Sequence, residues 1–145
     1  MVRRYLMVFA VLLAMPGASV WADDLTGSTR FLCAAVQATK CLEGGECEID
    51  VPWNLNIPEF IEIDLDARRL STTKASGQNR ATTIEHMSRR DGTIVLQGFE
   101  MKRAYSFVIT EQTGRVAVAV ATEGRVVSVF GACTALPSAA GPTAK

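Results

Sequence analysis

Residues 93–133 constrain the fold more than any other part of the chain, because strand-like runs alternate there with turn signals. Four runs rich in β-branched and aromatic residues span positions 94–99, 105–109, 116–121 and 126–130. The short segments between them are polar and include Glu123-Gly124. Connections this short join antiparallel neighbours. We therefore predict a four-stranded antiparallel meander that ends close to Cys133.

The upstream segments resemble further strands of the same kind. Residues 60–65 alternate, with Ile61, Ile63 and Leu65 on one face and acidic residues on the other, as a half-buried strand does. Weaker strand candidates are residues 30–39, 47–51, 70–73 and 82–88. The first of these could also form a short helix. No segment of useful length has a helical period. The sequence predicts an all-β fold, an antiparallel meander of about eight strands.

The chain has four cysteines, an even number that is typical of disulfides in an exported protein. The turn at 42–46 would bring Cys41 and Cys47 together, which leaves Cys33 to pair with Cys133. That second bond would place the first and last strands side by side, so we expect a small barrel, closed or incomplete. Zinc spacing is absent and there is one histidine, so no metal or cofactor is predicted.

Residues 1–22 have the layout of a secretory signal peptide. Arg3 and Arg4 precede eleven apolar residues, too few for a membrane span, and Ala22 ends a cleavage-like site. We expect a periplasmic or secreted product without a membrane span. The mature chain would have a flexible N-terminus at 23–29, one all-β domain at 30–134 and a disordered tail at 135–145.

Charge argues against one class of partner. The full chain has 15 basic and 15 acidic residues, and two of the basic ones lie in the predicted leader. The remaining chain is slightly acidic and carries no basic stripe, so nucleic acid is not an expected partner.

Four segments also resemble a family of short exported bacterial proteins of unassigned function. They are the hairpin Cys41 to Cys47, the run 56–60 (NIPEF), the run 95–98 (VLQG) and the ending 130–134 (FGACT). The resemblance implies a bacterial periplasmic protein. Its motifs are structural, so it assigns no active site and gives no information on chemistry.

The residues that could carry chemistry are few. His86 is the only histidine, and Glu85 would point to the opposite face of a strand, so we expect an ordinary histidine with one hydrogen bond. Glu62, Asp64 and Asp66 are expected to form the solvated face of a strand rather than a cation site.

The run 116–121 is unusual because both of its faces are apolar, valine on one and alanine on the other. A strand of this kind must be covered twice. Packing of another layer against the alanines is the favoured interpretation, and a lumen with room for a ligand is the alternative. Trp53, between Pro52 and Pro58, is expected as a buried plug over one end. The candidate ligand-binding residues are Trp53, Phe107, Ile109, Val118 and Phe130.

Three functional hypotheses follow. The favoured one is a non-catalytic exported binding module of the bacterial envelope, which holds a small apolar ligand or a protein partner. The second is a hydrolase-like enzyme, or an enzyme accessory, that uses His86 with a carboxylate. The third is a surface interaction or inhibitor domain.

Overall fold

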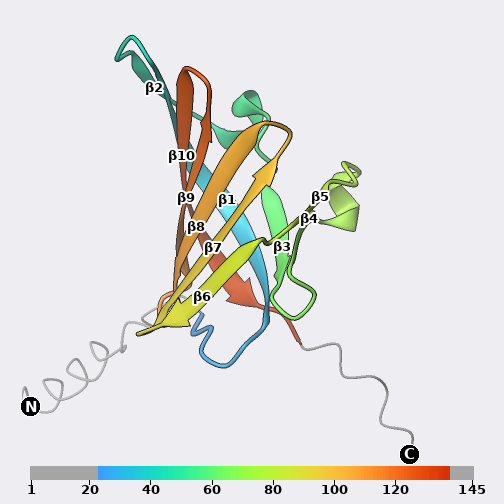
Figure 1. Cartoon of the computed structure of the whole chain (residues 1–145). Coiled ribbons are helices and arrows are strands. Elements are labelled where there is room, and N and C mark those ends of the chain that lie inside the picture. Colours follow the sequence, from blue (N-terminus) through green and yellow to red (C-terminus); the bar gives the residue numbers. More distant parts are fainter. Residues whose placement is uncertain (1–22, 138–145) are drawn as a thin grey trace, which may run out of the picture.

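The computed structural model describes residues 23–137 and contains ten β-strands and two short 3-10 helices (Figure 1). The elements in chain order are β1 (Arg30–Leu42), β2 (Cys47–Asp50), η1 (Pro52–Leu55), β3 (Phe60–Asp64), β4 (Arg69–Thr72), η2 (Lys74–Ser76), β5 (Ala81–Thr83), β6 (His86–Arg90), β7 (Thr93–Glu100), β8 (Arg103–Thr110), β9 (Arg115–Thr122) and β10 (Arg125–Ala135). The all-β prediction is confirmed.

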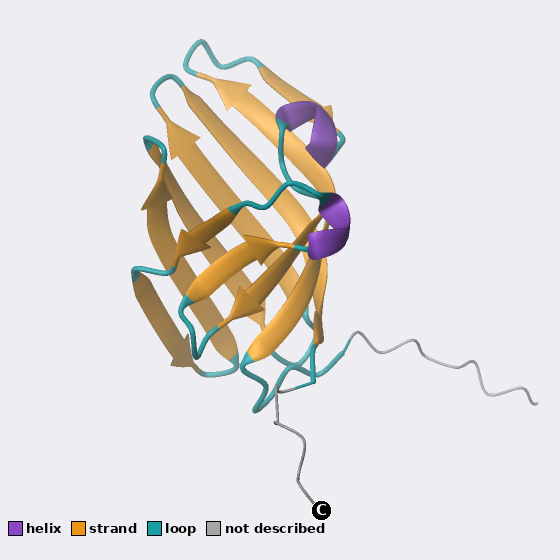
Figure 2. Ribbon diagram, turned by 90° about the vertical axis from the view of Figure 1, so that its right-hand side faces the viewer, coloured by secondary structure: helices purple, strands orange, loops and turns teal. Residues whose placement is uncertain are grey.

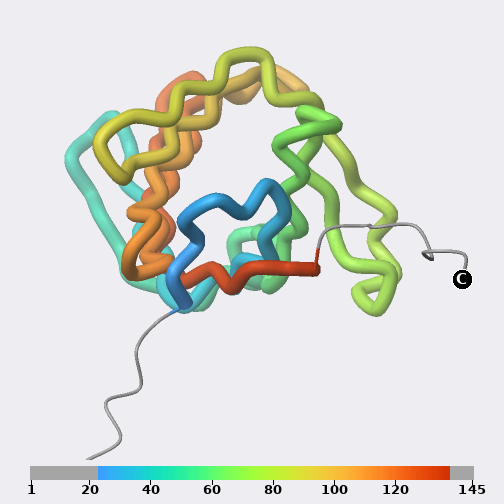
Figure 3. Tube along the Cα trace, turned by 90° about the horizontal axis from the view of Figure 1, so that it is seen from below, coloured from blue at the N-terminus to red at the C-terminus, as the bar shows by residue number. Residues whose placement is uncertain are grey.

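All strands belong to one antiparallel sheet with the order β5-β4-β3-β1-β10-β9-β8-β7-β6, and β2 pairs with β1 beside this path. The sheet curls into a half-barrel (Figures 2 and 3). The predicted meander is confirmed as β7 to β10, in which each strand pairs with the next. The incomplete form of the predicted barrel is the one observed.

The first and last strands lie side by side, as the cysteine pairing predicted. β1 pairs with β10, with Cys33 opposite Cys133, and the two cysteines form a disulfide. Cys41 and Cys47 form the second disulfide across the β1–β2 hairpin. Both predicted pairings are therefore confirmed, and the first ties together two residues 100 positions apart.

A β-bulge at Val36 bends β1 where it crosses β10. Ala35 is opposite Gly131 and Gln37 is opposite Phe130, so Val36 is the additional residue. A Cβ atom on Gly131 would lie 2.0 Å from the carbonyl oxygen of Ala34. Only glycine leaves room for the bent strand to approach this closely.

The run 82–88, which we expected to be one strand, is divided between the two edges of the sheet. The N–H of Ile84 donates to the carbonyl of Arg68 beside β4, and the N–H of Glu85 donates to Gln97 of β7. The Arg68 guanidinium donates to the carbonyls of both Ile84 and Glu85. The prediction was wrong because two neighbouring residues bond to opposite edges, which local alternation does not report.

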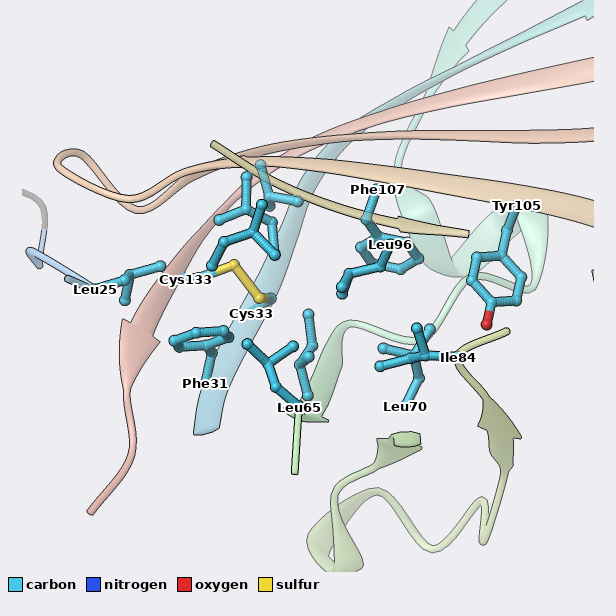
Figure 4. Close-up of a cluster of buried hydrophobic side chains, with 14 residues drawn as sticks. Leu25, Phe31, Cys33, Leu65, Leu70, Ile84, Leu96, Tyr105, Phe107 and Cys133 are labelled. Atoms are coloured by element: carbon cyan, nitrogen blue, oxygen red, sulfur yellow. A yellow bond between two sulfur atoms is a disulfide. The ribbon is translucent and has the colours of Figure 1, made fainter. Parts of the chain in front are cut away.

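The hydrophobic core fills the end of the barrel where the buried disulfide lies (Figure 4). Its members come from seven strands, from the β5–β6 junction, from the segment before β1 and from the residue after β3. The fully buried large side chains of this core are Leu25, Phe31, Ile63, Ile84, Ile94, Leu96 and Ile109.

The expected flexible N-terminus is wrong for Leu25, which is 0% exposed. Its N–H donates to the carbonyl of Glu111. The Arg89 guanidinium forms a two-point ion pair with the buried carboxylate of Glu111 and also donates to the carbonyls of Leu25 and Ser28. The hydrogen bond with Glu111 raises the pKa of Arg89. The segment before β1 is therefore bound to the barrel.

The predicted start of the C-terminal tail at position 135 is wrong. Ala135 belongs to β10, and the N–H of Leu136 donates to the carbonyl of Arg30. The rest of the predicted tail and the predicted signal peptide lie outside the described residues. Among residues 23–137, no helix has the length and apolar character that crossing a membrane requires.

Candidate ligand-binding cup

A cavity of about 460 Å³ opens at the end of the barrel opposite the packed core, and we call it the cup. The inward-facing rows of β8, β9 and β10 form one wall, and the η1 segment and β4–β5 form the other. The main apolar wall residues are Leu55, Ile57, Ile61, Tyr105, Phe107, Val116, Val118, Val120, Val127 and Val129.

The alternation of β9 explains why this wall is apolar. Val116, Val118 and Val120 face the cup, and the alanines between them face outward. Ala119 and Ala121 are exposed, so the favoured prediction that another layer packs against the alanines is wrong. One face of β9 lines a cavity, and the side chains on the other are small enough to leave little apolar surface in water.

The floor of the cup is made by Phe107, Leu70 and the sulfur-bonded Cys33. Phe107 packs edge to face against Tyr105, with ring centroids 5.8 Å apart. The Tyr105 hydroxyl donates to the carbonyl of Thr83, 2.6 Å away, and burial raises the pKa of Tyr105. Tyr105 and Phe107 belong to the core and also line the cup, so the two rings lie where the core and the cup meet.

The five predicted ligand-binding residues do not all meet. Phe107 and Val118 line the cup. Ile109 is fully buried in the core below it. Trp53 and Phe130 are 60% and 52% exposed and do not line the cup.

The prediction that Trp53 is a buried plug is wrong. The 3-10 turn of η1 buries Pro52 instead and directs Leu55 toward the cup, where Ile57 joins it. Residues so close together on a tight turn point in different directions. The two prolines predicted a loop, but the sequence did not show which apolar side chains of that loop would face inward.

Charged residues surround the mouth, and the sequence reasoning missed them. The inward-facing rows end in Glu100 on β7, Arg103 on β8 and Arg125 on β10, and Lys40 lies two residues before the end of β1. Arg80 reaches the mouth from the segment before β5. One sequence signal could have predicted them. On several strands, the alternating positions that face inward end in a charged residue next to a hairpin turn.

These groups interact with one another. Glu100 lies 3.4 Å from the guanidinium of Arg103 and 4.0 Å from that of Arg80. Arg80 also donates to the carbonyl of Asn56 in the η1 segment, 3.2 Å away. Lys40 forms an ion pair with Glu48 on the neighbouring β2. The mouth is thus a ring of partly paired charge above apolar walls.

The residues considered for catalysis lie elsewhere. His86 is exposed on β6, and no carboxylate among residues 23–137 forms an ion pair with it. Glu62 and Asp64 face Arg30, at 4.0 and 3.6 Å. The described part of the chain holds no group of three side chains suited to a metal ion. What the cup offers a ligand is apolar contact in its depth and charge at its mouth.

Among known proteins, no family model and no curated protein matches this chain.

Proposed function

We propose that this protein is a non-catalytic binding module exported to the bacterial envelope, and that it holds a small apolar ligand in the cup. The observation that carries the proposal is the cavity of about 460 Å³ with largely apolar walls. Its size lies within the range of about 300–1,000 Å³ that is usual for small-molecule sites, and such sites are mostly apolar with a few polar groups.

The contrast between the two ends of the barrel supports a binding role. The core end is filled by large side chains, including Phe31, Leu96 and Ile109. At the cup end the inward positions carry smaller ones, such as Ala35 and Val129. A barrel of about eight strands is just wide enough for side chains to fill. The small residues at one end leave the space that a ligand would occupy.

Two features support export. Both cysteine pairs are disulfides, and such bonds persist in oxidising compartments. The second is the sequence of residues 1–22, whose pattern is typical of a secretory signal peptide. A periplasmic location fits both features.

Binding of an uncharged fluorescent probe, N-phenylnaphthylamine, tests the proposal. Its emission should rise on mixing with the protein, because an apolar site removes it from water. Val118→Trp should abolish the rise by filling the cup. Ala119→Trp, on the outward face of the same strand, is the matched control and should leave it unchanged. An equal signal from both variants, or none from the unmodified protein, would overturn the proposal.

A further inference from the structure

We infer that the ligand of the cup is a free single-chain amphiphile with a carboxylate head, held with its tail inside and its head among the arginines of the mouth. This inference rests on the proposed function, because it assigns a chemical class to the ligand of the same cavity. Three observations support it: the charge balance of the mouth, the geometry around Glu100, and the length of the apolar wall.

The mouth carries an excess of positive charge. Four cations line it, Lys40, Arg80, Arg103 and Arg125, against the single carboxylate of Glu100. Glu48 on β2 pairs with Lys40. Within residues 23–137, no carboxylate lies within ion-pair distance of Arg125. An anionic head placed here would complete the charge balance, and a cationic head would add to the repulsion.

The position of Glu100 shows that a carboxylate fits between the arginines of the mouth. Two guanidiniums share it, at 3.4 Å for Arg103 and 4.0 Å for Arg80. Both distances exceed the roughly 2.7–2.9 Å of strong charge-assisted hydrogen bonds. The two arginine side chains are 25% and 27% exposed, so they lie partly out of water, where charge interactions are stronger. Each guanidinium has five N–H donors in a planar fork that matches a carboxylate, and Glu100 does not use them all.

The wall beneath the arginines suits one alkyl chain. On β10 the inward row runs from Arg125 through Val127 and Val129 to Gly131, without a polar side chain after the first. The six steps from Arg125 to Gly131 span about 20 Å at about 3.3 Å per residue. Of the uncharged polar lining residues, Thr122 lies at the mouth end of β9, and the others, Ser71, Thr72 and Thr82 among them, lie on the opposite wall. A tail along β9 and β10 would contact valines over its length, and the volume suits one chain.

Three probes with the same tail and different heads test the inference: dodecanoate, dodecanol and dodecyltrimethylammonium. Their affinities are measured by displacement of N-phenylnaphthylamine at neutral pH. Dodecanoate should bind about tenfold more tightly than dodecanol, and the ammonium probe should bind most weakly. Added salt should weaken dodecanoate binding and leave dodecanol binding almost unchanged.

Charge variants of the mouth give a test in two directions. Glu100→Gln removes the internal carboxylate that competes for the arginines, so dodecanoate should bind more tightly, a gain that damage to the fold would not produce. Arg125→Gln should weaken dodecanoate several-fold without affecting dodecanol. Arg115→Gln removes the same charge from an exposed position at the start of β9, at the opposite end of the strand from the mouth. It is the matched control and should change neither affinity.

The outcomes separate the two proposals. If neither the naphthylamine nor any amphiphile binds, the proposed function fails and this inference fails with it. If dodecanol or the ammonium probe binds as tightly as dodecanoate, the cup binds ligands but its assigned head group is wrong. If Glu100→Gln leaves dodecanoate affinity unchanged, the arginine pair does not hold the head.

Discussion

Tyr105 has one polar atom at the end of a buried ring, and that atom joins two distant strands. The hydroxyl on β8 donates to the carbonyl of Thr83 on β5. Gly98 is the residue opposite Tyr105 on β7, and a Cβ atom there would lie 2.3 Å from the phenol oxygen. The absence of a side chain at Gly98 therefore leaves room for the ring, and its hydroxyl joins the edge strand β5 to β8, which lies near the opposite edge of the sheet.

Replacement of Tyr105 by phenylalanine should lower the free energy of unfolding by about 1 kcal/mol at neutral pH, the usual value of one hydrogen bond. Burial raises the pKa of Tyr105 above the value of about 10 of an unfolded chain. The neutral phenol thus stabilises the fold fully below pH 10 or so, and this contribution is lost as the pH rises through the folded pKa. Urea unfolding at several pH values should show the difference between the two proteins shrinking above that range.

A direct titration checks the same claim. A chain without residues 1–22 has Tyr105 as its only tyrosine, so phenolate absorbance reports on that residue alone. A folded-state midpoint at or below that of a denatured control would contradict the assignment.

Single apolar residues were the least predictable part of the site. Phe107 and Phe130 both lie on predicted strands, yet Phe107 lines the cup and Phe130 is half exposed outside it. Alternation shows that residues two apart share a face. Which face of a strand turns inward depends on the curl of the whole sheet. Both faces of β9 are apolar, so its alternation did not show which face lines the cup.

The burial of Leu25 in the segment of residues 23–29 could not be predicted from the local sequence pattern. The segment has one large apolar residue, Leu25, among polar neighbours, so it looks like a frayed end. Its burial depends on partners far along the chain, namely Glu111 and Arg89. Their contacts cannot be read from the local sequence.

Truncation of Leu25 to alanine should therefore destabilise the protein by about 2–4 kcal/mol, as for a fully buried leucine whose site cannot collapse. Leu42→Ala is the matched control, because Leu42 is partly exposed at the end of β1 and should cost less than about 1 kcal/mol. Urea denaturation measures both. Equal small losses would show that the N-terminal segment does not contribute to the core.

The junction of β5 and β6 illustrates the same limit for strands. Residues 82–88 have the composition of one strand, and the local pattern contains no break. The strand is interrupted because Ile84 hydrogen-bonds to Arg68 beside β4, whereas Glu85 hydrogen-bonds to Gln97 on β7, near the opposite edge of the sheet. Local propensity predicts that a segment is extended, and the arrangement of the other strands decides with which edge it pairs.

At the scale of the molecule, the covalent closure of the sheet was predictable and the cup was not. Four cysteines and one short turn were enough to pair β1 with β10. The cup volume depends on the summed side chains of many strands and on the turn of η1 over them. Its charged mouth results from several hairpin ends that lie far apart in the sequence.

The two disulfides should contribute unequally to the stability of the whole protein. Cys33–Cys133 closes a separation of 100 residues and Cys41–Cys47 one of 6. Loop-closure entropy gives about 4–5 kcal/mol for the first and about 2 kcal/mol for the second. Cys33 and Cys133 are also buried in the core, so their replacement by alanine removes packing as well. The double variant C33A/C133A should thus unfold at a markedly lower urea concentration than C41A/C47A.

Reduction should follow the reverse order, because access to a thiol reagent follows exposure. Cys47 is exposed on β2, whereas Cys33 and Cys133 are each 5% exposed. In dilute dithiothreitol under native conditions, the Cys41–Cys47 bond should open first with little loss of structure. The Cys33–Cys133 bond should open only as the barrel unfolds. Alkylation and peptide mapping over time measure the two rates. Simultaneous opening would show that the reagent reaches the Cys33–Cys133 bond while the barrel is still folded, for example through the cup, which Cys33 lines.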